Sequence, residues 1–523
     1  MTASLLSLTG ALAVARDEIL DAIVANQTIL RFVFRLVSTA SIPPEVFEEA
    51  LSCLTTLSED NLPTGQAIIN DQETRCYDEL LKLKAAGGAR AVLACGVLHN
   101  VFTSLQWLDH SPGQDGACDA ILVPSLAHAL EQLSPSGGKI NGHGASSHFG
   151  IVQIALEILA SIGTDLQNTL EKGNRSQLSR PKVEEEWTGF DDNAGADAME
   201  VDEGDDNDEG DDKDVASDEE DSDDDGEIDI DADMERVTGA EELVGEGGLD
   251  DLPTLRELIH TAVPQLIRLA NITINSDEDI AIQMHAFSAL NNIAWTISCI
   301  EFAGGENAKV FAAWAPAAKK IWLKAIAPVL TADNADLALA TLVTGLAWAI
   351  ARSLNGDTPS DGAQHRKFIA LYQATKAQGP GQDRMQDGGN GDRDGQEDPF
   401  QTIGVKCIGV LGSLARDPTP VNVNRDVGIF LVALLGHPDA PAADVIEALN
   451  QVFDLYGDED AACDKEVFWK DNFLKHLEEL LPRLKTIAKG IDKRKSQELR
   501  TKADEAILNL GRFIKYKKKT APR

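Results

Sequence analysis

The chain has 523 residues, of which 43% are apolar and only 5% aromatic, and its formal net charge is −40. This charge argues against direct binding to nucleic acid or to an anionic membrane, because both are polyanions, and it favours basic proteins as partners. We expect no membrane span, since no apolar stretch approaches the ~20 uncharged residues that a bilayer requires. The abundance of Leu and Ala favours helices.

The first residues and the cysteines both indicate a protein of the cytosol or the nucleus. The opening MTASLLSLTG lacks a basic region followed by a long apolar core, so we expect no secretion signal. The seven cysteines are scattered without a CxxC pair. Such thiols behave as small apolar side chains in a reducing compartment.

One short helical pattern recurs along the chain: an apolar residue, two variable residues, Ile, Leu or Val, and then a small residue or Phe. The ends of its copies at 58 and 102, 294 and 347, and 415 and 453 are 44, 53 and 38 residues apart. Armadillo and HEAT repeats run ~40–47 residues. Each copy carries the apolar stripe of a helix packed inside a stack. The eight copies end at Ser58, Phe102, Ala160, Ala294, Ala347, Ala415, Phe453 and Gly511.

A single copy of this pattern is common in any helical protein, but eight copies at near-regular spacing favour an all-α solenoid of armadillo/HEAT type. The two widest gaps contain insertions, which a stack tolerates because repeats touch only their neighbours. We therefore expect two arms with a long acidic disordered loop inserted between them. The predicted parts are armadillo-like repeats at 1–180, the acidic loop at 181–250, and HEAT-like repeats at 251–523 with a flexible insertion at 377–398.

The acidic run extends from Glu184 to Asp233 and holds 27 Asp and Glu residues against one lysine. It cannot bury enough apolar surface to offset its ordering entropy, so we expect a solvated insertion that reaches a basic partner. The alternative is a solvating spacer without a specific partner. Near its end, apolar residues alternate with carboxylates, which predicts a short acidic helix that forms on binding a basic protein. The partner-binding residues of this helix would be Ile230, Asp233, Met234, Glu235 and Val237.

The variable positions of the recurrent helix are the expected contact surface of a concave groove. Asparagine side chains can each donate to and accept from the backbone of an extended peptide, and tryptophan rings can stack on Lys and Arg stems. The alternative is that the tryptophans belong to the core and that the asparagines cap or bridge neighbouring helices. The predicted groove residues are Asn100, Trp107, Asn291, Asn292, Trp295, Trp348 and Asn450.

No common catalytic motif occurs, whether a phosphate-binding GxxxxGK[ST] loop, GxSxG, HExxH or GxGxxG. The ten histidines are dispersed, and His99 lies within a helical apolar pattern that is typical of a satisfied core or groove histidine. The dense carboxylates lie in the acidic run, which cannot hold the geometry that acid–base catalysis needs. We expect no enzyme activity, no cofactor and no metal site.

Several long segments resemble fungal symportins, the synchronised importers of ribosomal proteins, which are related to the animal HEAT-repeat-containing protein three. The clearest are residues 53–61, 94–122, 251–269, 288–308 and 447–482. The resemblance implies an armadillo/HEAT solenoid with an acidic loop. It also implies a transport adaptor and chaperone that carries the two large-subunit ribosomal proteins bound to 5S rRNA, shuttling between cytoplasm and nucleus. One cargo would offer an N-terminal peptide to the groove, and the loop helix at 232–237 would hold the other.

Symportins open with a basic nuclear-import segment, whereas this chain opens at a point that resembles the inside of the third or fourth helical repeat. The resemblance implies the import receptor transportin as a further partner, but through that basic segment. An alternative function is a karyopherin-like receptor for basic nuclear-localisation peptides. A third is a static scaffold that the acidic loop keeps soluble.

Overall fold

The computed structural model describes residues 1–39, 41–132, 148–177, 251–300, 307–331, 336–360, 362–377 and 398–522, without the side chains of 168–177 and 377. Within these ranges the regular elements are helices, and no strand occurs. The predicted acidic loop at 181–250 and nearly all of the insertion at 377–398 lie outside the described residues.

A row of nine helices runs through the described ranges, each packed on the next, and we call this row the ladder. All eight copies of the recurrent pattern lie on it, one to a helix and in chain order, which confirms the predicted helical repeat. The ladder helices are α1 (Thr2–Ala15), α4 (Pro44–Ser58), α7 (Ala89–Leu105), α9 (His148–Gln177), α13 (Asp277–Ser298), α16 (Leu337–Leu354), α18 (Ile403–Ala415), α20 (Ala442–Tyr456) and α22 (Gln497–Lys519).

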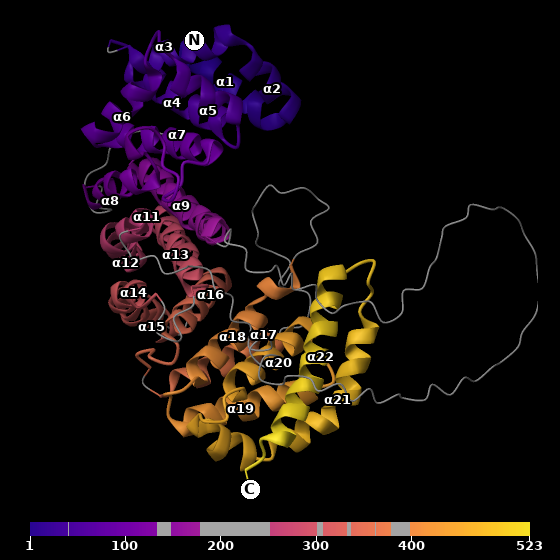
Figure 1. The fold of residues 1–523 in the computed structure, drawn as a ribbon. Coiled ribbons are helices and arrows are strands. Elements are labelled where there is room, and N and C mark those ends of the chain that lie inside the picture. Colours follow the sequence, from indigo (N-terminus) through magenta and orange to yellow (C-terminus); the bar gives the residue numbers. More distant parts are fainter. Residues whose placement is uncertain are drawn as a thin grey trace, which may run out of the picture.

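A second layer of helices covers one side of the ladder, and the described parts together form a curved rod. Figure 1 shows α9, α13 and α16 on the inner side of the curve and α8, α12 and α14 on its outer side. The second layer consists of α2 (Asp17–Ala25), α3 (Gln27–Ser38), α5 (Leu62–Asn70), α6 (Cys76–Ala86), α8 (Val123–Gln132), α11 (Pro253–Glu257), η4 (Leu258–Ala262), α12 (Val263–Ala270), α14 (Ala308–Ile321), η6 (Trp322–Ile326), α15 (Ala327–Thr331), α17 (Gln364–Ala377), α19 (Val421–Gly436), η8 (Asp464–Trp469) and α21 (Phe473–Gly490).

The number of helices per repeat changes along the rod. Two helices precede each of α4 and α7, whereas one helix precedes α18 and one precedes α20. Three-helix units are typical of armadillo repeats, and helix pairs are typical of HEAT and tetratricopeptide repeats. The boundaries of the two predicted arms remain predictions.

The ladder continues directly from α9 to α13, the two helices that flank the acidic run in the sequence. Their contact is close because a Cβ added at Gly163 would lie 3.0 Å from the Ile293 side chain. The Thr296 hydroxyl donates to the Gly163 carbonyl at 2.8 Å, and the Asn292 amide donates to the Ala160 carbonyl at 3.2 Å. The described parts before and after the acidic run therefore form one stack.

Two polar contacts in the outer layer join the same two parts. The Asp109 carboxylate accepts from the Thr254 hydroxyl at 2.5 Å and from the Thr254 backbone N–H at 3.0 Å, next to the start of α11. Arg268 of α12 donates to the Leu130 carbonyl at the end of α8, at 2.6 Å. These bonds satisfy backbone groups at helix ends that would otherwise lack partners.

Two ladder helices are long and apolar enough to cross a membrane by length and composition, which differs from the sequence-based expectation: residues His148–Gln167 of α9 and Leu337–Leu354 of α16. In the structure, 50% and 56% of these windows are buried. Each of them packs against the ladder helix before it and the ladder helix after it. Their apolar character is that of core helices in a stack.

Glycines on α18 allow side chains from both neighbouring ladder helices to cross it. A Cβ at Gly409 would lie 2.1 Å from the Trp348 ring of α16, and one at Gly412 would lie 1.8 Å from Oε1 of Gln451 on α20. Neither position can therefore hold a larger residue unless the crossing side chain moves.

We expect Gly409→Ala to destabilise the protein by about 1–3 kcal/mol, because the added methyl group overlaps the Trp348 ring. Urea unfolding followed by tryptophan fluorescence measures this change. Gly511→Ala is the matched control, because Gly511 lies within α22 and a Cβ there meets nothing within 4 Å. The control should be neutral or more stable by up to about 1 kcal/mol, since alanine favours helix. Equal stability of the two variants would contradict the overlap.

Candidate functional site

The structure brings two of the predicted groove tryptophans together. Trp295 of α13 and Trp348 of α16 meet edge to face, with ring centroids 5.2 Å apart and ring planes at 74°. Both side chains are half-buried. The Arg352 guanidinium lies 6.0 Å from the centre of the Trp295 ring. This pair offers a partly exposed aromatic surface, which the crossing over Gly409 fixes in place.

An unsatisfied acceptor lies on the same ladder helices. Oδ1 of Asn291 is buried and has no hydrogen-bond partner among the described residues. It lies 3.1 Å from where a Cβ would stand on Gly345 of α16. Buried polar atoms almost always have partners, so such an exception calls for an explanation.

Lys406 of α18 also approaches Gly345, with its stem 3.7 Å from the same Cβ position. Burial lowers the pKa of the Lys406 ammonium group, and no carboxylate of the described residues lies within ion-pair distance of it. Asn291, Gly345 and Lys406 therefore follow one another across three ladder helices, with an acceptor at one end and a cation at the other.

A buried carboxyl group that the sequence analysis missed lies on α20. Glu447 is 8% exposed, and it accepts a hydrogen bond of 2.7 Å from Nε2 of Gln451. Burial raises the pKa of Glu447 to about 7, and the nearby Asp454 adds to this effect. Oε1 of Gln451 is buried without a partner among the described residues. Asn450, a predicted groove residue on the same helix, is exposed.

Three other predicted groove residues have partners within the protein. Nδ2 of Asn100 donates to the Thr55 carbonyl at 2.9 Å and so bridges α7 to α4, and Asn292 bridges α13 to α9. Trp107 lies beyond the end of α7, where its ring stacks on Phe102 and meets the edge of Tyr77. These contacts correspond to the bridging and core roles that the sequence analysis gave as the alternative.

The predicted partner-binding residues of the acidic loop, Ile230, Asp233, Met234, Glu235 and Val237, lie outside the described residues. Their role therefore stays a prediction, as does the role of the groove residues in binding a partner.

His99 of α7 is a satisfied core histidine. Its Nδ1 lies 3.0 Å from the Asp119 carboxylate and its Nε2 lies 2.9 Å from the Ser161 hydroxyl. Burial of the ring opposes its charge, but Asp119 and the nearby Asp165 outweigh burial and raise the pKa of His99. Although the order Ser–His–Asp resembles a hydrolase triad, two carboxylates favour the imidazolium form, which cannot accept a proton from serine.

The whole chain is similar to Symportin 1 of Chaetomium thermophilum, with 60% identity over 532 residues that cover 100% of this chain and 77% of that protein. The chain belongs to the symportin family. A family model described as SYO1-like, TPR repeats, matches residues 279–521. As predicted, this symportin-family chain is not an enzyme. Where the sequence analysis expected HEAT-like repeats, the family description names TPR repeats, which are also helix pairs.

Two further relatives match shorter parts of the chain. The "Armadillo repeat protein involved in nucleocytoplasmic transport Syo2" of Schizosaccharomyces pombe is 39% identical over 112 residues, which cover 21% of this chain and 17% of that protein. "Synchronized import protein 1" of Saccharomyces cerevisiae is 30% identical over 113 residues, which cover 21% of this chain and 18% of that protein.

We expect Glu447→Gln to change how stability depends on pH. The unfolded glutamate has a pKa near 4.3, so between about pH 4.3 and 7 the folded state binds more protons and stability falls as pH rises. Above pH 7 the buried carboxylate costs up to about 4 kcal/mol, which glutamine removes while it still accepts from Gln451. The variant should therefore be more stable than the native protein at pH 8 and lose most of this gain near pH 4.5.

Urea unfolding at several pH values measures the effect. Glu505→Gln is the matched control, because Glu505 is an exposed carboxyl group on α22. If both variants follow the pH profile of the native protein, Glu447 does not carry the raised pKa.

Proposed function

We propose that this protein is a transport adaptor and dedicated chaperone for the two large-subunit ribosomal proteins that bind 5S rRNA. It would bring them together into the nucleus for assembly of the 5S particle. The observation that carries the proposal is the similarity to Symportin 1 along the whole chain. The names of the two other relatives, which refer to nucleocytoplasmic transport and to synchronized import, support it.

The ladder provides the surface for the N-terminal peptide of one cargo. Trp295 and Trp348 would contact the stems of its basic side chains, and the Asn291 side chain would turn outward to accept from its backbone. Asn450, which is exposed, lies on α20, two ladder helices beyond α16. Asn100 and Asn292 would instead keep the ladder helices aligned, because their amides already bind neighbouring carbonyls.

The acidic run provides the surface for the other cargo. Its 27 carboxylates from Glu184 to Asp233 attract a basic RNA-binding protein and occupy the surface that its RNA would use. The residues from Ile230 to Val237 would form the contact helix. The adaptor would shuttle between cytoplasm and nucleus.

Deletion of Glu184–Asp233 should weaken binding of one cargo by about tenfold or more and leave the other nearly unchanged, because only one cargo depends on the acidic run. Binding of the sensitive cargo should also fall steeply with salt. Calorimetry with each purified ribosomal protein measures both effects. The ladder should remain folded, since α9 packs directly on α13.

A second variant replaces the same fifty residues with an uncharged Gly/Ser linker of equal length, which separates loss of charge from loss of length. An equal loss of affinity for both cargoes and for an unrelated basic protein would indicate a non-specific polyanion and contradict the proposal.

Trp348→Leu and Trp295→Leu should each weaken binding of the N-terminal cargo peptide by about ten- to a hundredfold, as expected for aromatic residues at the centre of an interface. Trp107→Leu is the matched control, because Trp107 is equally half-buried but packs on Tyr77 away from this pair. Fluorescence anisotropy with a labelled peptide measures affinity. If unrelated nuclear-localisation peptides compete equally well, the karyopherin-like receptor becomes the better interpretation.

A further inference from the structure

The last two long helices of the chain have the opposite charge to the rest. Residues 473–522, which contain the hairpin of α21 and α22, hold 14 Lys and Arg residues against six Asp and Glu residues. The whole chain has a net charge of −40. A cluster of positive charge on this hairpin produces a positive local electrostatic potential, whereas the rest of the chain is negative.

Several cations at the base of the hairpin have partners within the fold. Lys517 is fully buried, and its Nζ lies 2.9 Å from the Asp464 carboxylate. Lys518 lies 2.7 Å from Glu478. Arg483 donates to the carbonyls of Gly436 and His437. These bonds fix the base, where the exposed Lys515 and Lys519 of α22 are the cations without a carboxylate of the described residues within ion-pair distance.

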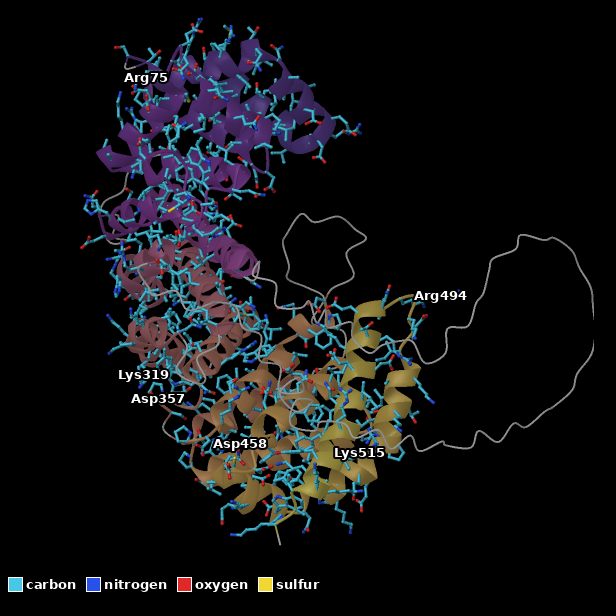
Figure 2. All side chains as sticks on the ribbon, in the orientation of Figure 1. Arg75, Lys319, Asp357, Asp458, Arg494 and Lys515 are labelled. Carbon is cyan, nitrogen blue, oxygen red and sulfur yellow. The ribbon has the colours of Figure 1, made fainter. Side chains whose placement is uncertain are left out.

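Cations at the tip of the hairpin have no such partners. Five exposed cations lie in the last turns of α21 and in the turn that follows, and none has a carboxylate of the described residues within ion-pair distance. Figure 2 shows Arg494 where α21 meets α22, whereas Lys515 lies further along α22, toward the other end of that helix. We call these five residues the basic tip: Lys485, Lys489, Lys493, Arg494 and Lys495.

The one carboxylate in the turn between α21 and α22, that of Asp492, accepts a hydrogen bond from the backbone. Oδ1 of Asp492 accepts from the Arg494 backbone N–H at 2.9 Å, and the Asp492 carbonyl accepts from Lys495 and Ser496 at 3.2 and 2.9 Å. This turn therefore holds three consecutive cations in a defined arrangement. Lys485 and Lys489 are four residues apart on an exposed helix face, where like charges repel. A bound anion would relieve that repulsion.

We propose that the basic tip is a binding site for a short run of Asp and Glu residues. A long polyanion such as RNA would extend beyond the tip and meet the acidic remainder of the surface, within the ~8–10 Å over which charges act in physiological salt. The tip sequence KTIAKGIDKRK also contains no aromatic residue on which a base could stack. A short acidic peptide avoids both problems.

The occupant that we assign to the tip is the chain's own acidic run, which holds 27 Asp and Glu residues against one lysine and, as part of the same chain, is present at a high effective concentration. An acidic segment of a partner protein is the other outcome that the test distinguishes. The probe is a fluorescently labelled peptide with the sequence of residues 218–227, DEEDSDDDGE. It is titrated into the full chain and into the variant that lacks 184–233, at about 50 mM and about 200 mM salt. Binding that is tighter to the deletion variant than to the full chain, and that is lost when the tip cations are replaced, supports the chain's own run as the occupant. Equal binding to both proteins contradicts this assignment and indicates an acidic segment of a partner protein.

The decisive variant replaces Lys493, Arg494 and Lys495 with serine, and it should weaken probe binding by about tenfold or more. The matched control removes the same charge from the exposed lysines Lys309, Lys320 and Lys324 of α14 and η6 and should leave binding nearly unchanged. All six side chains are exposed, so circular dichroism should show unchanged folding. The proposal is wrong if neither protein binds the probe, if the two triple variants lose equal affinity, or if a twenty-nucleotide polyuridine RNA binds more tightly than the peptide.

Discussion

Direct packing of each ladder helix on the next is the interaction on which the rest of this structure depends. The contact between α9 and α13 matters most, because these helices are far apart in the sequence and the acidic run lies between them. Their close approach at Gly163 and Ile293 lets one hydrophobic core run from the first helix to the last. The tryptophan pair, the unsatisfied Asn291 and the basic tip all have fixed positions because that stack is continuous.

Local sequence was sufficient to predict eight of the nine ladder helices and insufficient to predict what their polar residues do. An apolar stripe at i, i+3 and i+4 is a property of a single helix, so all eight copies were found without knowledge of their neighbours. Asn100 and Asn292 occupy variable positions that also suit peptide binding. Whether an amide binds a peptide or the next helix depends on a carbonyl supplied from another repeat, which no local pattern shows.

The same reason explains the residues that were missed. Glu447 looks like an ordinary surface carboxyl group of a helix, and its burial depends on packing against other helices, which local sequence does not show. The crossing of Trp348 over Gly409 joins residues on different helices in the same way. Composition alone indicated only that the partners are basic proteins, whereas the family resemblance indicated ribosomal proteins. The resemblance did not show which predicted groove residues already bind neighbouring helices.

The direct contact between α9 and α13 has a consequence for how such a protein can change over evolution or in the laboratory. Because α9 and α13 contact each other directly, the stack itself sets no limit on the length of the stretch at 178–250 between them. A fluorescent protein or an unrelated folded module placed there would leave the neighbouring repeats in register. The protein is in this sense a scaffold with a built-in insertion point.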